Sequence, residues 1–152
     1  METLKISSEG KNFSALNLGS LDNLMDYSFL HPRLKTEIKG KVFVGELLKS
    51  TGAEISFNIL QANTSIPFLH QHKNQEEIYI FLKGSGEFQV DEVIFEIQEG
   101  SVIRVAPEGK RSCRNSSNSQ MIYLCIQTKL NSLDNYLVFD GFRTPGEIPW
   151  KQ

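Results

Sequence analysis

Two histidines and a carboxylate lie close together in the middle of the sequence and are a candidate metal site. His70 and His72 are separated by one residue, and Glu77 follows five positions after His72. On an extended chain, residues i and i+2 point to the same face, so both imidazoles face one side. We expect Glu77 to return to that face at the start of a strand over Ile78–Leu82. Two imidazoles and a carboxylate suit a first-row divalent ion (Fe, Mn, Zn or Ni), with coordination positions open to water or substrate.

The spacing alone leaves a second interpretation open. Two unrelated histidines in a polar turn would have the same pattern, and the segment from His70 to Glu77 is polar throughout. Glu76 also offers a second carboxylate at nearly the same distance from His72. The choice therefore depends on the elements that hold these residues.

Most of the sequence predicts short β-strands. Apolar runs alternate with turn residues at a spacing of roughly ten residues, which is typical of antiparallel sandwiches and barrels. The predicted strands cover Lys41–Leu48, Ala53–Leu60, Ile78–Leu82, Phe88–Val90, Val93–Ile97, Ser101–Val105 and Met121–Gln127. Before them, Ser20 can cap a short helix over residues 21–26. Residues 84–86, Gly-Ser-Gly, predict a hairpin turn between two strands.

The composition is that of a globular protein with no electrostatic preference for nucleic acid or anionic membranes. Hydrophobic residues make up 39% and charged residues 22% of the 152 residues, and the formal net charge is −2. No apolar run approaches the roughly 18 residues of a membrane span, and the first residues do not predict a signal peptide. Cys113 and Cys125 match no metal or redox motif, so we expect buried reduced thiols. These features favour a cytoplasmic protein.

The segment from Thr64 to Gly84 resembles the first motif of the cupin superfamily, G-x5-H-x-H-x3-4-E-x6-G. The two histidines and Gly84 stand at matching distances, while Thr64 replaces the first glycine. Glu76 fits the shorter gap to the histidines, but only Glu77 also fits the six-residue gap to Gly84. The resemblance therefore implies His70, His72 and Glu77 as metal ligands.

The second cupin motif is G-x5-7-P-x-G-x2-H-x3-N, and Gly100, Pro107 and Gly109 match its first part. Counting forward from Pro107 places Ser112 at the histidine position, whereas counting back from Asn115 places Arg111 there. Neither residue is a good metal ligand, so the usual fourth ligand is lost. This leaves either a three-ligand site with extra open positions or a weakened site that holds metal poorly.

The resemblance implies an all-β fold, a double-stranded β-helix of the cupin or jelly-roll type, with a short N-terminal helix. The chain also resembles a group of small single-domain bacterial cupins of unassigned activity. We expect one domain over residues 1–152, with a motif core at about residues 40–128. Residues 129–152 then form an apolar strap that packs on the barrel or on a partner subunit.

A basic cluster follows Pro107 beside the expected barrel mouth. On a strand after this turn, Arg111 and Arg114 point to opposite faces, so one of them points inward. An inward arginine near a metal ion favours a bound carboxylate or phosphate between the two cations. The alternative is that the inward arginine pairs with Glu77 or Glu76, which would favour a metal-free barrel.

These observations favour a metal-dependent cupin that binds a small anionic molecule, as an oxygenase or an isomerase. The alternative is a non-catalytic ligand-binding or sensing cupin with weak or no metal. Tyr79 and Phe81 share the strand parity of Glu77 and are candidates to line the pocket, although core packing is their more ordinary role. Exposed sheet edges and strands that are apolar on both faces also predict a homodimer.

Overall fold

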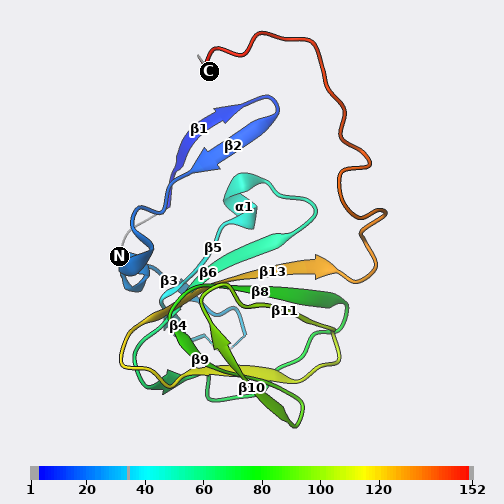
Figure 1. The fold of residues 1–152 in the computed structure, drawn as a ribbon. Helices are drawn as coiled ribbons and strands as arrows, with labels where there is room; N and C mark the ends of the chain where they lie inside the picture. Colours follow the sequence, from blue (N-terminus) through cyan, green and yellow to red (C-terminus); the bar gives the residue numbers. More distant parts are fainter. Residues whose placement is uncertain (1–3, 34, 151–152) are drawn as a thin grey trace.

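The computed structural model describes residues 4–33 and 35–150, and its elements are mostly β-strands (Figure 1). The N-terminal elements are β1 (Ile6–Gly10), β2 (Phe13–Leu16), the 3-10 helix η1 (Leu21–Asp26), β3 (Ser28–Leu30), β4 (Glu37–Lys39), β5 (Lys41–Phe43) and the short helix α1 (Gly45–Leu48). The remaining strands are β6 (Glu54–Leu60), β7 (Thr64–Ser65), β8 (Gln75–Lys83), β9 (Ser85–Val90), β10 (Val93–Gln98), β11 (Val102–Val105), β12 (Arg111–Asn115) and β13 (Met121–Lys129). None of the described helices has the length and apolarity needed to span a membrane.

Two antiparallel sheets form the body of the molecule. One has the strand order β10-β9-β12-β7, and the other has the order β11-β8-β13-β6-β5. The chain passes repeatedly between the two sheets, so strands that are consecutive in sequence often belong to different sheets. This arrangement confirms the predicted double-stranded β-helix.

Side chains of alternating parity build two separate apolar clusters. Inside the barrel, buried residues of both sheets pack together: Tyr79, Phe81, Phe88, Ile97, Val105, Cys113, Met121, Tyr123 and Cys125. Outside it, the opposite faces of β5, β6 and β13 pack against N-terminal residues, and the buried members are Leu18, Leu24, Tyr27, Val42, Val44, Ile59 and Ile122. The β5–β6 side of the five-stranded sheet is therefore covered by apolar side chains on both faces, and its residues do not alternate cleanly between apolar and polar.

The predicted strand over Lys41–Leu48 ends early. β5 pairs with β6 only over Lys41–Phe43, and a single helical turn follows at Gly45. The carboxylate of Glu54 accepts a hydrogen bond from the Gly45 amide at 2.9 Å, in place of a backbone carbonyl of the neighbouring strand. This side-chain acceptor ends the ladder, a contact that apolar patterning does not reveal.

The predicted hairpin turn at residues 84–86 is wrong, because the chain crosses from one sheet to the other at Gly84. β8 pairs with β11 and β13, whereas β9 pairs with β10 and β12. Gly84 has a φ of +84°, and a Cβ atom there would lie 2.8 Å from the carbonyl oxygen of Gln120. Only glycine fits this turn of the chain without strain.

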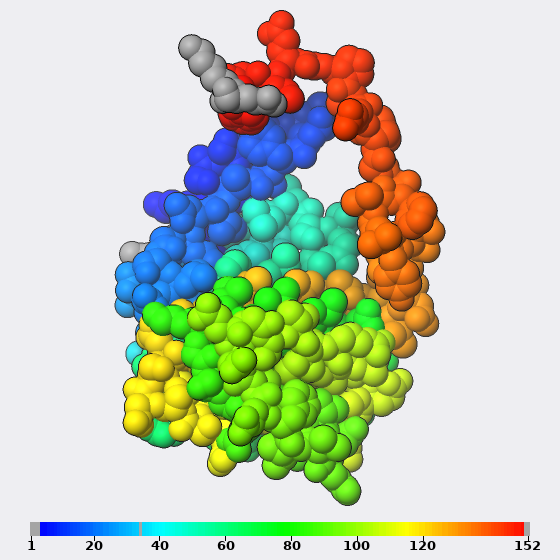
Figure 2. All heavy atoms as spheres, in the orientation of Figure 1, coloured from blue at the N-terminus to red at the C-terminus, as the bar shows by residue number. Residues whose placement is uncertain are grey.

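Both ends of the chain extend beyond the barrel. The β1–β2 hairpin projects from one side, and residues 131–150 run away from the end of β13 without strands (Figures 1 and 2). The large apolar side chains of this C-terminal segment are 67–89% exposed, and they are Leu133, Tyr136, Leu137, Val138, Phe139, Phe142, Ile148 and Trp150. These side chains are not packed on the barrel of the same chain. Packing of the strap on a partner subunit stays a prediction.

Candidate metal site and its surroundings

Backbone pairing holds the two histidines beside the start of β8. His70 forms an isolated antiparallel bridge with Arg111, with N···O distances of 3.2 and 2.9 Å between their backbones. The backbone amide of His72 donates to the carbonyl of Pro107 at 3.0 Å. These backbone hydrogen bonds join the loop before β8 to β12 and to the turn at Pro107. The segments that carry the two cupin motifs therefore lie side by side.

Glu77 is a buried carboxylate in the third position of β8. It is 2% exposed, and several donors surround it. Oε2 accepts from the hydroxyl of Tyr79, and Oε1 accepts from Nε2 of Gln127 at 2.9 Å and from the thiol of Cys125 at 3.3 Å. The neighbouring strands β8 and β13 therefore hold this carboxylate in one orientation.

The two imidazoles converge on this carboxylate. His72 Nε2 lies 3.0 Å from Glu77 Oε1, and His70 Nε2 lies 3.7 Å from Glu77 Oε2. One ligand atom of each residue lies within 4.8 Å of the other two. Among the described residues, the buried side-chain nitrogens without a hydrogen-bond partner are His70 Nδ1, His72 Nε2 and Arg111 Nε. The donor set and its unpaired nitrogens fit a divalent cation.

Arg111 lies on the inner side of the same site. Its side chain is 1% exposed, and its Nε lies 3.1 Å from Glu77 Oε2. Its two terminal nitrogens contact the carbonyl oxygens of His70 and Ala106 at 3.4 and 3.3 Å. The sequence left two possibilities for an inward arginine, which were to bind an anion or to pair with a glutamate. The structure shows the second, because Arg111 pairs with Glu77. Arg111, not Ser112, faces the site where the cupin signature has its third histidine.

The electrostatic environment favours an ionised Glu77 and a neutral His72. Burial alone would raise the pKa of Glu77, but hydrogen bonds from His70 and Tyr79 and the charges of His72 and Arg111 together hold that pKa well below its usual range. Burial lowers the pKa of His72, and the Arg111 charge adds to this effect while Glu77 opposes it. A neutral imidazole beside a carboxylate is the protonation state that a metal ligand requires.

The other residues named from the sequence lie in the core or on a different surface. Tyr79 and Phe81 are 4% and 1% exposed and pack inside the barrel. Burial raises the pKa of the Tyr79 hydroxyl, which donates a hydrogen bond to Glu77. Cys113 and Cys125 are free and buried, as expected, and burial raises the pKa of both thiols to about 12.

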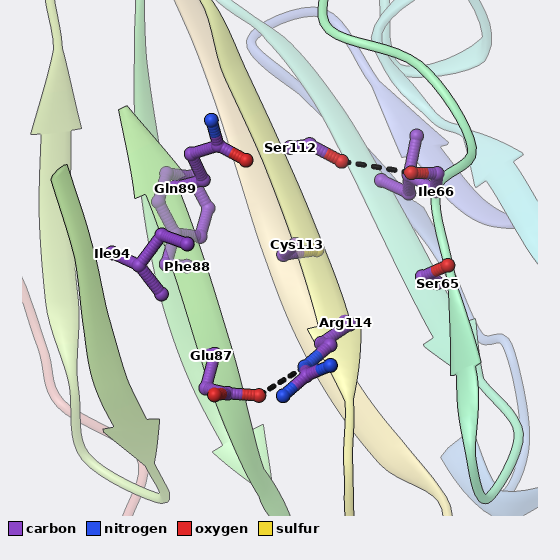
Figure 3. A pocket seen from close by; sticks show the side chains of 9 residues that line it. All are labelled: Ser65, Ile66, Glu87, Phe88, Gln89, Ile94, Ser112, Cys113 and Arg114. Atoms are coloured by element: carbon purple, nitrogen blue, oxygen red, sulfur yellow. Dashed lines mark hydrogen bonds and ion pairs between the residues drawn. The ribbon is translucent and has the colours of Figure 1, made fainter. Parts of the chain in front are cut away.

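Ser112 and Arg114 point away from Glu77, on the opposite face of β12. Ser112 Oγ donates to the carbonyl of Ile66 at 2.8 Å, and Arg114 forms an ion pair with Glu87 on β9 (Figure 3). Both line a shallow cavity of about 330 Å³ over β9 and β12. The Arg114 guanidinium therefore does not share the surroundings of the two histidines.

Gln127 is the site residue that the sequence reasoning missed. It contacts Glu77 from β13, where Tyr123, Cys125 and Gln127 all face inward. The available signal was a polar residue at the end of the apolar run 121–126, because a polar side chain at an inward position of a strand needs a polar partner inside the barrel.

Comparison with known proteins agrees with this fold. The model of the cupin domain family matches residues 57–127. A crystal structure of a cupin protein from Bacteroides fragilis is 42% identical to this chain, with a TM-score of 0.66 over 69% of this chain and 89% of that one. The chain therefore belongs to the cupin family.

Two further relatives are more distant. An uncharacterised protein of Methanocaldococcus jannaschii is 35% identical over 57 residues, which is 38% of this chain and 46% of that protein, so the match spans less than half of this curated relative. A Cupin 2 conserved barrel domain protein from Salinispora arenicola shares the fold at 16% identity, with a TM-score of 0.58 over 76% of this chain and 91% of that one.

Proposed function

We propose that this cupin holds a divalent first-row metal ion through His70, His72 and Glu77 and binds a small molecule beside it. The observation that carries the proposal is the convergence of the three ligand atoms within 4.8 Å of one another. The position of His72 Nε2, 3.0 Å from Glu77 Oε1, supports it further. An imidazole nitrogen without a proton and a carboxylate oxygen are both electron-pair donors, so the two together attract a divalent cation.

Each surrounding residue has a separate task in this proposal. Tyr79 and Gln127 orient the carboxylate through hydrogen bonds, which is the role of outer partners in metal sites. Burial keeps His72 neutral and available as a ligand. A bound ion would act as a Lewis acid that polarises an oxygen of the small molecule.

Metal analysis of the purified protein tests this proposal. Protein prepared without chelator is expected to contain up to about one equivalent of a first-row metal, and the His70→Ala/His72→Ala variant is expected to contain none. His31 lies outside the site, so His31→Ala is the matched control and is expected to retain the metal. Equal metal content in the double variant and the wild type would refute the assignment.

A second function is favoured by the ion pair between Arg111 and Glu77. An arginine at 3.1 Å from the ligand carboxylate neutralises its charge and repels a cation, which supports a non-catalytic binding or sensing cupin without metal. Oxygen uptake by Fe(II)-loaded protein separates this function from an oxygenase. The reaction class stays open between oxygenase and isomerase, because a fold does not fix a reaction.

A further inference from the structure

A second cavity, of about 740 Å³, opens beside His72. Its volume lies within the range of small-molecule sites, roughly 300–1,000 Å³. Three of its lining residues are cations, Arg33, Lys73 and Lys129, and among the described lining residues none is acidic. The lining also includes three side-chain amides, those of Gln71, Asn74 and Gln75.

The three cations come from separate parts of the chain. Arg33 belongs to the turn between β3 and β4, and its backbone amide donates to His31 Nδ1 at 3.2 Å. Lys73 directly follows His72. Lys129 ends β13, where it pairs in register with Gln75 of β8. The fold therefore brings together charges that lie far apart in sequence.

None of these cations has a carboxylate partner in the part of the chain that the structure describes. The two nearest acidic residues along β8 are already paired. Glu76 binds Arg104 at 2.5 Å, and Glu77 binds Arg111. Three like charges around one cavity repel each other, and a bound anion would remove that repulsion.

We propose that this cavity binds a small anion with carboxylate or phosphate groups, held by Arg33, Lys73 and Lys129. The amides beside them are suited to hydrogen-bond the polar remainder of the ligand. The inference rests on the proposed small-molecule function and names its ligand class. It also assigns anion recognition to cations other than Arg111 and Arg114, whose guanidinium groups are occupied by Glu77 and Glu87.

Calorimetric titration with glycerol 3-phosphate and with malonate tests the proposal, with glycerol as the neutral control. The wild type is expected to bind at least one of the two anions, and binding of only one identifies the phosphate or the carboxylate as the recognised group. The Lys73→Gln/Lys129→Gln variant is expected to bind at least about tenfold more weakly, because two charge-assisted contacts are lost. Lys129→Arg keeps the charge and is expected to retain binding.

Lys11→Gln, in the distant β1–β2 turn, removes the same charge outside the cavity and controls for net charge. No binding of either anion by the wild type at 10 mM of each, or an equal loss in Lys11→Gln, would overturn the inference. Metal content of the same samples separates the two proposals. Bound metal without anion binding refutes the anion site alone, whereas anion binding without metal supports the anion site and refutes the metal site.

Discussion

Arg111 sets the charge of the candidate metal site. The cupin signature has a histidine at this place, which would add a neutral ligand, whereas this chain has a buried cation 3.1 Å from the Glu77 carboxylate. The net charge that a divalent ion would meet is therefore less negative than the three ligands alone suggest. Metal affinity depends on ligand number and on local charge, and Arg111 affects both.

Replacing Arg111 with histidine is expected to strengthen metal binding by about tenfold or more, because it adds a ligand and removes a positive charge. The backbone bridge between residues 70 and 111 does not involve the side chain and is expected to keep the new imidazole in place. Competition with a chelating dye measures the affinity for Zn²⁺ in wild type and variant.

Arg111→Gln separates the two contributions, since it removes the charge and adds no good ligand. We expect its affinity to lie between those of the wild type and Arg111→His. A histidine variant that binds no more tightly than the glutamine variant would show that position 111 does not face the ion.

Protonation of His72 is expected to destabilise the metal-free protein in mild acid. Burial, with the Arg111 charge, lowers the pKa of His72 below its ordinary 6.5. The unfolded chain then binds more protons than the folded one in this range, so stability falls as pH drops through 6.5, by at most about 1.4 kcal/mol per pH unit for one group. The lowered pKa of Glu77 acts only below its ordinary 4.5.

Urea unfolding in the presence of chelator, at several values between pH 7 and pH 5, measures this effect. The His72→Asn variant serves as the control and is expected to lose less stability over the same range. A metal-free wild type that becomes more stable toward pH 5 would contradict the assignment.

At the scale of the element, the backbones of β9 and β12 come close together at Gly86. A Cβ atom on this residue of β9 would lie 2.1 Å from the carbonyl oxygen of Arg114 on β12. The same strand β12 carries Arg111, and its register against β9 runs from Arg111 opposite Val90 to Arg114 opposite Glu87. A glycine on β9 therefore allows close packing against the strand that carries Arg111.

Gly86→Ala is expected to lower the free energy of unfolding by about 2–3 kcal/mol, because the methyl group forces the two backbones apart. Gly52→Ala is the matched control: nothing lies within 4 Å of a Cβ atom there, so we expect a change within about 0.5 kcal/mol. Urea unfolding measures both. Equal stabilities of the two variants would contradict the close approach.

The elements that sequence patterns revealed are those with a clear apolar pattern. The alternation of residues 53–60 predicted β6, and the apolar runs at 78–82 and 121–127 predicted β8 and β13. The motif spacing located His70, His72 and Glu77 in one cluster. The direction of Arg111 was left open, because the segment from Pro107 to Asn115 is one residue shorter than the motif, so that counting from its two ends gave two different residues. Periodicity reports only local structure, so it revealed the strands and left their turns undetermined.

Contacts between distant segments escaped sequence reasoning for a different physical reason. The Glu54 carboxylate that ends β5, and the cavity that Arg33 shares with Lys129, depend on loops whose conformation has no period. These residues come together only because of the complete topology of the two sheets. A short stretch of sequence does not determine that topology.

At the scale of the whole molecule, an apolar row crosses the outer face of the five-stranded sheet. Val102, Ile80, Leu124 and Phe57 stand opposite one another on β11, β8, β13 and β6. The N-terminal segment packs against the Phe57 end of this row, whereas Val102 at the other end is 64% exposed. The sheet is therefore covered at one end only.

The exposed C-terminal segment has the same apolar character. Tyr136, Leu137, Val138 and Phe139 are each at least 77% exposed, although burial of such side chains is worth roughly 1.5–3 kcal/mol each. A single chain leaves both this segment and the Val102 end of the sheet uncovered, and each is chemically suited to cover the other in a second copy.

We therefore expect a homodimer in which the C-terminal segment of one subunit packs on the other. Light scattering at micromolar concentration is expected to give about twice the 17.2 kDa of one chain. The Leu137→Ser/Phe139→Ser variant is expected to shift the protein toward the monomer, because it removes the apolar area that association buries. Asn135→Ser/Asp140→Ser changes polar positions of the same segment and is expected to leave the dimer intact. A monomeric wild type at this concentration would refute the prediction, and a dimer that survives the apolar changes would move the interface away from this segment.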